Sequence, residues 1–388
     1  MQYRQFGKLG YDVSLLGFGV MRLPRLTDAD GGYYVDREKA FELLRYAADN
    51  GVNYFDTAFG YHAETAEEVL GEALDGGRRA SVKIATKQPL YAMKTRGDIR
   101  RNLENTLRKL RTDHVDVYMI HGIGPRDWEN VAELGVVEEF EKFRSEGMIG
   151  AVAFSYHGNY AHFKEVLESY AWDMCLVQQN MLDSDREVTD KVYRLTARHG
   201  AALAIMEPLR GGGLAGAPGI VQEIYGAYGV RRSSAEWAFR YLIDHPEISV
   251  ILSGMSTLEQ LKENIEIFSK PDAVPGCLTA EEKDVISWAR AAYDSIVTIP
   301  CTACEYCMPC PSGVNIPGIF SFYNDAKRFE FFETRRRSYM FMTNGGKDYT
   351  RCINCGSCEP KCPQNIDIQN QLRIAHDALK GWTEVPGA

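Results

Sequence analysis

Short apolar runs alternate with amphipathic stretches along most of the chain. Eight of the runs are almost entirely apolar, which is typical of strands that are buried on both faces. They are VSLLGFGV from Val13, VNYFDTA from Val52, SVKIATK from Ser81, VDVYMIH from Val115, IGAVAFS from Ile149, MCLVQ from Met174, AALAIME from Ala201 and ISVILSG from Ile248. The pattern therefore predicts a set of buried, parallel strands.

The stretches between these runs carry apolar residues at helical spacing. REKAFELLRYAADNG begins at Arg37 and ends at Gly51, a residue type that suits a helix C-terminus. Similar helices are expected from Asp98, from Val136 and from Glu281. Strands and helices that alternate in this number favour a closed (β/α)8 TIM barrel. A doubly wound open sheet is the alternative, but it usually has fewer strands and a glycine fingerprint that GFGVMR does not match.

The composition is that of a globular protein, with 45% hydrophobic and 25% charged residues in 388. A net charge of −9 argues against a nucleic-acid partner. The first residues contain no apolar stretch of signal-peptide or membrane length, so a cytoplasmic location without membrane association is expected. In that compartment clustered cysteines bind metal more often than they form disulfides.

Four titratable side chains are expected at one end of such a barrel. Asp56, Lys87 and His121 end three of the predicted strands, and Tyr61 follows in the loop after Asp56. Chemistry in these barrels takes place at the C-terminal ends of the strands. A lysine lowers the pKa of a neighbouring phenol, a carboxylate keeps that lysine charged, and a histidine can orient a carbonyl. The set can protonate a carbonyl oxygen as hydride reaches its carbon, although each residue alone would more often be an ordinary polar group.

These residues lie in stretches that resemble a known family. NYFDTAFGY, IATK and VYMIH resemble the segments that carry the Asp-Tyr-Lys-His tetrad of the aldo/keto reductases, and the likeness spans about residues 1 to 290. The resemblance implies that Tyr61 is the proton donor, that Lys87 and Asp56 tune it, and that His121 orients the substrate carbonyl. It also implies NADP or NAD as the cofactor and a small carbonyl compound or alcohol as the substrate.

The same resemblance implies a set of nucleotide contacts, because MEPLRGGGL, LSGMS and KENIEIF are similar to that family's nucleotide-binding loops. Tyr156, Met206 and Gln260 stand where many members have an asparagine, an aromatic residue and a 2′-phosphate-binding arginine. For the family glutamine of the sixth strand, Gln178, Gln179 and, by an ungapped count, Leu176 are alternatives. The expected contact residues are Met21, Arg22, Ser155, Gln178, Pro208, Leu209, Arg210, Gly211, Gly213, Gly254, Ser256, Gln260, Glu263 and Asn264.

A glycine-rich segment, LRGGGLAG at residues 209–216, follows the seventh predicted strand. TIM barrels often bind phosphate at this place, and glycines let backbone N–H groups approach an anion. A flexible loop would have the same composition. The position in the barrel favours a phosphate-binding role, with Arg210 close by.

Eight of the ten cysteines lie in two short runs, CTACEYCMPCP from Cys301 and CINCGSCEPKCP from Cys352. The second run has the spacing of bacterial two-cluster ferredoxins, and the first is one residue shorter before its last cysteine. In that pattern the fourth cysteine of each run ligates the other cluster. Structural zinc is the alternative, but its ligands usually form two well separated pairs. We expect two [4Fe–4S] clusters, one on Cys301, Cys304, Cys307 and Cys362 and one on Cys352, Cys355, Cys358 and Cys310.

The sequence thus predicts a barrel over residues 1–294 and a helical ferredoxin-like domain over residues 295–388, which resembles the dicluster module of a subgroup of aldo/keto reductases. The intact tetrad favours a nicotinamide-dependent oxidoreductase. The alternatives are a one-electron reductase that the clusters supply, with a vestigial nicotinamide site, and a non-enzymatic electron carrier. The basic residues 335–337 could dock a ferredoxin or flavodoxin, but a solvated helix edge is the preferred interpretation.

Overall fold

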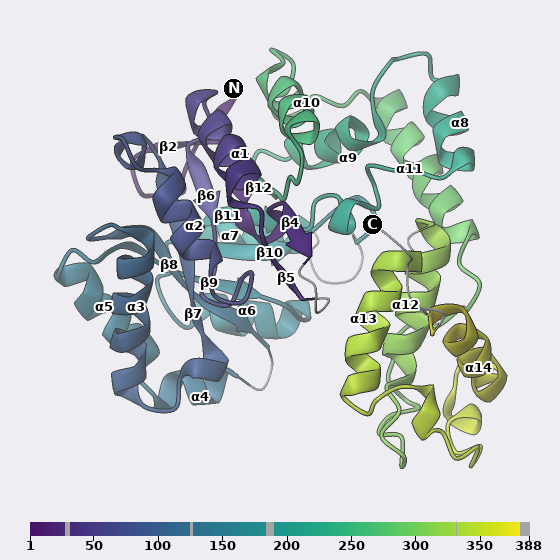
Figure 1. Cartoon of the computed structure of the whole chain (residues 1–388). Helices are drawn as coiled ribbons and strands as arrows, with labels where there is room; N and C mark the ends of the chain where they lie inside the picture. The colour runs from purple at the N-terminus through teal and green to yellow at the C-terminus, as the bar shows by residue number, and fades with distance from the viewer. Residues whose placement is uncertain (28–31, 125–126, 184–189, 331, 381–388) are drawn as a thin grey trace. The chain divides into compact units, whose positions relative to one another are not determined.

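The computed structural model describes residues 1–27, 32–124, 127–183, 190–330 and 332–380 (Figure 1). The chain divides into two compact units, the first formed by Met1–Gly211 with Glu236–Thr279 and the second by Gly212–Ala235 with Ala280–Ala388. Within the described ranges, none of the helices has the length and apolar character needed to cross a membrane.

Eight parallel strands close into a barrel in the first unit, with β12 pairing with β3 to complete the ring. Each of the eight predicted runs overlaps one of these strands, so the TIM-barrel prediction is confirmed. The barrel strands are β3 (Leu16–Gly19), β6 (Tyr54–Asp56), β7 (Lys83–Pro89), β8 (Val115–Ile123), β9 (Ile149–Tyr156), β10 (Met174–Gln178), β11 (Ala202–Met206) and β12 (Ile248–Ser253).

The first predicted run holds two strands and not one. β2 (Asp12–Ser14) forms an antiparallel hairpin with β1 (Tyr3–Gln5), and the barrel strand begins only at Leu16. The chain turns at Ser14, whose hydroxyl donates to the Leu16 carbonyl oxygen at 2.7 Å and accepts from the Asn53 amide at 2.9 Å. The apolar pattern does not reveal this turn because Val13 is buried in the hairpin just as Leu16 is buried in the barrel.

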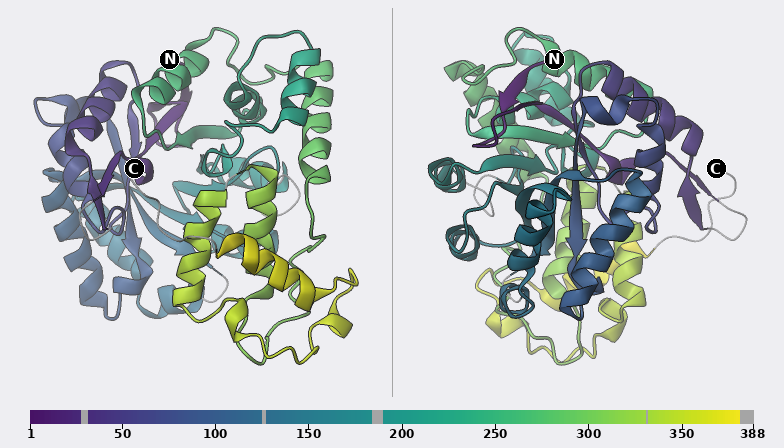
Figure 2. Two further views of the ribbon diagram at one scale, coloured as in Figure 1. Left: turned by 45° about the vertical axis from the view of Figure 1, so that its right-hand side comes forward. Right: turned by 90° about the vertical axis from the view of Figure 1, so that its left-hand side faces the viewer.

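The helices of the barrel lie outside its strands (Figure 2). Most of them bury an apolar stripe, and α1, for example, buries Ala40, Leu43, Leu44 and Ala47. A second hairpin follows β3, and the sequence pattern does not predict it. These helices and this hairpin are α1 (Arg37–Asp49), α2 (Ala66–Ala73), α3 (Arg96–Leu110), α4 (Trp128–Glu133), α5 (Val136–Ser145), α6 (Tyr160–Glu168), α7 (Asp190–His199), α9 (Ser234–Ile243), α10 (Leu258–Ser269), β4 (Arg25–Thr27) and β5 (Tyr33–Val35).

Side chains from alternate positions of the strands fill the interior of the barrel. Ala85, Met119, Ala153, Leu176 and Ala204 all belong to one buried cluster. The interior is therefore a packed core and not a pore. Polar side chains that serve a ligand must lie at its rim.

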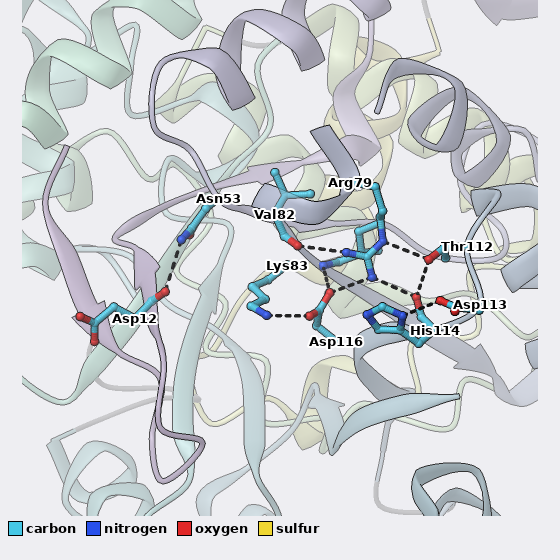
Figure 3. A network of polar contacts seen from close by, with 10 residues as sticks. Asp12, Asn53, Arg79, Val82, Lys83, Thr112, Asp113, His114 and Asp116 are labelled. Atoms are coloured by element: carbon cyan, nitrogen blue, oxygen red, sulfur yellow. Dashed lines mark hydrogen bonds and ion pairs between the residues drawn. The ribbon is translucent and has the colours of Figure 1, made fainter. Parts of the chain in front are cut away.

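A polar network at the N-terminal end of the barrel joins β7 to β8 (Figure 3). The buried Asp116 carboxylate accepts hydrogen bonds from Lys83 Nζ at 3.0 Å and from an Arg79 guanidinium nitrogen at 3.1 Å. It also accepts from the Ile84 backbone amide at 2.9 Å. These contacts hold the two strands together at the end opposite the catalytic rim of a TIM barrel.

The described part of the second unit consists of helices joined by loops, some of which carry the cysteines. α12, α13 and α14 pack together (Figure 1). They share an apolar core that includes Ile319, Phe320, Tyr339 and Leu372. The helices of this unit are α8 (Gly219–Ala227), α11 (Ala280–Ser295), α12 (Ile316–Arg328), α13 (Phe332–Asn344) and α14 (Ile368–Leu379).

Candidate active site and metal centres

An ion pair between Asp56 and Lys87 lies at the C-terminal end of the barrel. Asp56 is the last residue of β6, and Lys87 lies near the end of the neighbouring β7. Lys87 Nζ is 2.6 Å from Asp56 Oδ1 and donates to the Thr57 carbonyl oxygen at 2.6 Å. The two side chains are almost completely buried. Burial alone would lower the pKa of Lys87, but Asp56 and Tyr61 raise it above its ordinary value, so the ammonium stays charged.

Tyr61 is placed by a turn with an unusual backbone. Residues 62–64, none of them glycine, have φ values of +50°, +52° and +68°. Such left-handed conformations cost roughly 1 kcal/mol or more per residue. The Ala66 amide donates to the Tyr61 carbonyl oxygen at 3.3 Å and closes the turn. The turn sets the Tyr61 ring over Lys87, with 4.9 Å between Nζ and the ring centroid.

A bulge in β8 carries His121. The register of β8 against β9 shifts at this point, and Gly122 has a φ of +68°. The Gly122 amide donates to the buried Ser155 Oγ at 2.7 Å. Bulges re-aim side chains, and here the His121 ring lies edge-on to Tyr61 with 6.1 Å between ring centroids. Ser155, which is expected to contact nicotinamide, thus also fixes the strand segment that carries His121.

The structure brings Asp56, Tyr61, Lys87 and His121 together at one end of the barrel. The expected lowering of the Tyr61 pKa by Lys87 is outweighed, because burial raises the pKa of this phenol by more than Lys87 lowers it. Burial, Lys87 and His157 depress the pKa of His121 to about 3, so its imidazole is neutral at physiological pH. A protonated phenol and a neutral imidazole beside a fixed ammonium can protonate and hydrogen-bond a carbonyl oxygen.

Loops after β3, β11 and β12 meet near this tetrad. Met21 and Arg22 form a short turn after β3, and the Arg22 carbonyl oxygen accepts from the Ser256 hydroxyl at 2.7 Å. The Arg22 guanidinium lies 3.9 Å from the Glu207 carboxylate. Glu207 is in turn near enough to Tyr61 to raise the pKa of the phenol. A Cβ on Gly254 would lie 2.5 Å from Arg22 Cγ, so this close approach requires glycine.

The start of α10 is tied to the loop after β12. Gln260 Oε1 accepts from the Ser256 amide at 2.9 Å, and Asn264 Nδ2 donates to Ser253 Oγ at 3.0 Å. Glu263 is exposed on the same helix. Helix N-termini attract phosphate groups, and the contact of these residues with a nucleotide stays a prediction.

The loops after β10 and β11 carry the remaining barrel contacts. Gln178 pairs with Met206 at the last register position of the two strands. Leu176 lies in the barrel core, and Gln179 Nε2 donates to the Tyr241 hydroxyl at 3.5 Å. Of the three alternatives for the family glutamine, Gln178 is thus the one at the rim of the barrel.

A carboxylate that the sequence pattern does not single out, Asp183, links these two loops. It forms an ion pair with Arg210 and accepts from Gln178 Nε2 at 2.9 Å. Pro208 is buried, whereas Leu209 and Gly211 are half-buried in the same segment. The position of Asp183, five residues after the end of β10, is the one signal in the sequence that could have drawn attention to this carboxylate.

Gly213 belongs to the second compact unit. A Cβ at this position would be 2.8 Å from the ring of the buried Phe329. Packing against that ring explains why the position has no side chain.

The eight cysteines of the two runs border two small cavities. Cys307 borders both, so the cavities are neighbours. The other lining cysteines are Cys301, Cys304 and Cys362 for one cavity, and Cys310, Cys352, Cys355 and Cys358 for the other. These sets have the crossed pairing of a two-cluster ferredoxin, because the fourth cysteine of each run lies at the cavity of the other run.

This arrangement of thiols fits iron–sulfur clusters, whose ligands bind different irons of one cube. The Asn354 amide also donates to Cys352 Sγ at 3.4 Å, a contact of the type that tunes cluster thiolates.

Two family models match the two parts of the chain. The aldo/keto reductase family matches residues 15–272, and a 4Fe-4S dicluster domain matches residues 300–366. The uncharacterized oxidoreductase YqkF of Bacillus subtilis is 26% identical over 298 residues, which cover 69% of this chain and 90% of that protein.

Solved structures agree with the fold. The holo form of aldo-keto reductase AKR11C1 from Bacillus halodurans is 25% identical with a TM-score of 0.62, covering 74% of this chain and 96% of its own. An aldo-keto reductase from Klebsiella pneumoniae in complex with NADPH shares the fold at 22% identity and a TM-score of 0.58, covering 75% of this chain and 96% of its own. The barrel and the ferredoxin-type domain predicted from the sequence are both confirmed.

Proposed function

Since the chain belongs to the aldo/keto reductase family, we propose that it transfers hydride between NADPH or NADH and a small carbonyl compound or alcohol. The contact of Tyr61 with the Asp56–Lys87 ion pair is the observation that carries this proposal. His121, edge-on to the phenol, completes a set that can act on a carbonyl oxygen.

Each residue of the tetrad has a separate task in the proposed reaction. Bound nicotinamide supplies or accepts the hydride. Tyr61 donates its proton to the substrate oxygen as negative charge develops there, and neutral His121 donates a hydrogen bond to the same oxygen. Lys87, charged because of Asp56, stabilises the phenolate that remains. Burial raises the pKa of Tyr61, so the phenol carries at neutral pH the proton that carbonyl reduction needs.

Exchange of Tyr61 for phenylalanine tests this function. Tyr61→Phe should lower kcat for nicotinamide-dependent carbonyl reduction by about 100-fold or more and leave nucleotide affinity almost unchanged. Tyr54→Phe is a matched control on β6, because the Tyr54 hydroxyl is buried and has no hydrogen-bond partner among the described residues. The measurements are nicotinamide absorbance with a panel of carbonyl compounds and nucleotide titration. A wild-type protein that binds neither nucleotide at millimolar concentration would contradict the proposal.

We propose that the ferredoxin-type domain holds two [4Fe–4S] clusters, and the two cysteine-lined cavities support this proposal. Iron and acid-labile sulfide analysis of anaerobically purified protein should give about eight irons and eight sulfides per chain. Stoichiometric zinc without sulfide would exclude this assignment.

A difference in charge between the two cavities favours a second function, electron exchange with an acidic one-electron carrier. Among the described residues, the cavity that Cys355 borders is lined by Lys361 and by no carboxylate. The cavity that Cys301 borders is lined by Glu305 and by no Lys or Arg among the same residues. A reduced ferredoxin or flavodoxin would approach the first cavity more readily. Lys361→Glu should slow oxidation of that carrier by the protein and spare reduction by dithionite. Equal effects on both reductants would argue against docking there.

A further inference from the structure

Asp183 is a buried carboxylate that binds three side chains at the barrel rim. It is 4% exposed and lies in the loop after β10. One carboxylate oxygen accepts from Gln178 Nε2 at 2.9 Å and from Asn180 Nδ2 at 2.6 Å, and the other pairs with the Arg210 guanidinium. A carboxylate in this setting is stable only with such partners, so the three groups and Asp183 fix one another.

The Arg210 pair holds a loop whose backbone is otherwise unfavourable. Glu207 and Arg210 have φ values of +56° and +48°, and the adjacent Gly211 has +68°. Asn180, itself bound to Asp183, donates to the Glu207 carbonyl oxygen at 3.2 Å. Both ends of the strained segment are therefore connected to the same carboxylate.

The Gln178 contact determines which group the amide presents to a ligand. Leu176 lies in the barrel core, and side chains alternate along a strand, so Gln178 is on the inward side at the rim. Its Nε2 donates to Asp183. The amide oxygen is then the group presented to the mouth, where it can accept from the carboxamide N–H of a nicotinamide.

We propose that Asp183 is a positioning residue for the nicotinamide half of the dinucleotide, an inference that rests on the proposed function. It orients the Gln178 amide and holds the Arg210 loop in the conformation that accepts this half. Because Asp183 neutralises Arg210, the arginine helps to hold this loop and does not act as a cation that binds phosphate directly. The adenine half is bound elsewhere, along the start of α10.

The test compares three variants and one control. Asp183→Asn keeps the shape and removes the charge, Arg210→Met removes the other partner, and the double variant removes both. Asp173→Asn is the control, because Asp173 is a buried carboxylate just before the same strand at its opposite end, 2.9 Å from Arg144. The dissociation constants of NADPH, NADH and ADP are measured calorimetrically for each folded protein.

Asp183→Asn and Arg210→Met should each weaken binding of the reduced dinucleotide preferred by the wild type by about tenfold or more. ADP affinity should change less than about twofold, and the double variant should bind no more weakly than Asp183→Asn alone, since Arg210 acts through Asp183. Asp173→Asn should lower thermal stability and leave nucleotide affinity unchanged.

Other results overturn the inference. Tighter dinucleotide binding by Asp183→Asn, with weaker binding by Arg210→Met, would make Arg210 a direct phosphate ligand. Equal losses for ADP and the dinucleotide, or an equal loss in Asp173→Asn, would reduce Asp183 to a general stabilising role. If the wild type binds a dinucleotide and none of the variants differs, this inference alone fails. If the wild type binds neither dinucleotide, the proposed function fails with it.

Discussion

Lys87 and Asp56 are buried together, so the charge of each depends on the other. Their Nζ–Oδ1 distance of 2.6 Å and the Thr57 contact hold the ammonium beneath the Tyr61 ring. Burial raises the pKa of the Tyr61 phenol, whereas Lys87 lowers it by a smaller amount. The lysine therefore limits an increase in the pKa and does not make the phenol acidic. Alcohol oxidation needs Tyr61 as the phenolate, so the pH dependence of that reaction tests the opposing effects of burial and Lys87 on the pKa of Tyr61.

Lys87→Met should move the pH profile of alcohol oxidation upward by about one unit or more. The sign follows from the environment of Tyr61, because Lys87 lowers the pKa of the phenol and its loss leaves burial and Asp56 to raise it. The measurement is the initial rate of nicotinamide reduction against pH. Lys83→Met, at the start of the same strand and paired with Asp116, is the control and should keep the wild-type profile. A profile that is unchanged or shifted downward in Lys87→Met would contradict this account.

His121 should make the protein less stable in mild acid. Burial depresses the pKa of its imidazole to about 3, whereas an unfolded histidine titrates near its ordinary value of 6.5. Between pH 6.5 and about pH 3 the unfolded chain binds a proton that the folded chain does not. The free energy of unfolding therefore decreases as the pH is lowered through this range. The contribution is about 2 kcal/mol between pH 7 and pH 5.

His121→Asn should therefore lose less stability than the wild type on acidification over the same window. Chemical unfolding at the two pH values measures the difference. His199→Asn on α7, where the side chain is exposed, serves as the control and should follow the wild type. Parallel losses in His121→Asn and the wild type would show that His121 is not the group responsible.

At the scale of single residues, the sequence reveals side-chain types better than their environments. The strand-end positions of Asp56, Lys87 and His121 are visible because each follows an apolar run. The direction of the Tyr61 pKa is not visible, because burial depends on neighbours that are distant in sequence. Asp183 is missed for the same reason, since its partner Arg210 lies on the next loop.

At the scale of elements, the apolar runs predict the barrel strands because parallel strands are buried on both faces. The two hairpins have strands of three residues each, too short for a clear alternation. The bulge that carries His121 is also hidden, because Gly122 alone does not distinguish a bulge from a strand end.

The network around Asp116 should stabilise the barrel without affecting the site (Figure 3). Asp116→Ala leaves Arg79 and Lys83 without their shared carboxylate and should cost about 3 kcal/mol of unfolding free energy. Nucleotide affinity should stay at the wild-type level, because the network is at the opposite end of the strands. Urea unfolding and nucleotide titration check the two parts. Asp113→Ala, an exposed neighbour that contacts His114, should leave both quantities almost unchanged.

At the scale of the whole molecule, packing and composition divide the chain at different places. α11 ends the barrel pattern in the sequence, yet it belongs to the compact unit that contains the cysteines. Tyr293 of α11 contacts Phe329 at 5.6 Å between ring centroids, and Asp294 pairs with Arg328 at 2.9 Å. No composition change marks these contacts, so the sequence alone cannot place α11.

The crossed assignment of the cysteines leads to a test in which pairs of variants matter more than single ones. Cys301 and Cys362 border the same cavity. Cys301→Ala and Cys362→Ala should each reduce iron from about eight to about four per chain, with no further loss in the double variant. Cys301→Ala combined with Cys310→Ala should remove nearly all iron, because the two thiols border different cavities. If each run instead bound its own cluster, the second pair would keep about four irons and the first would lose all of them. Cys277→Ala, outside both runs, is the control and should retain the full iron content.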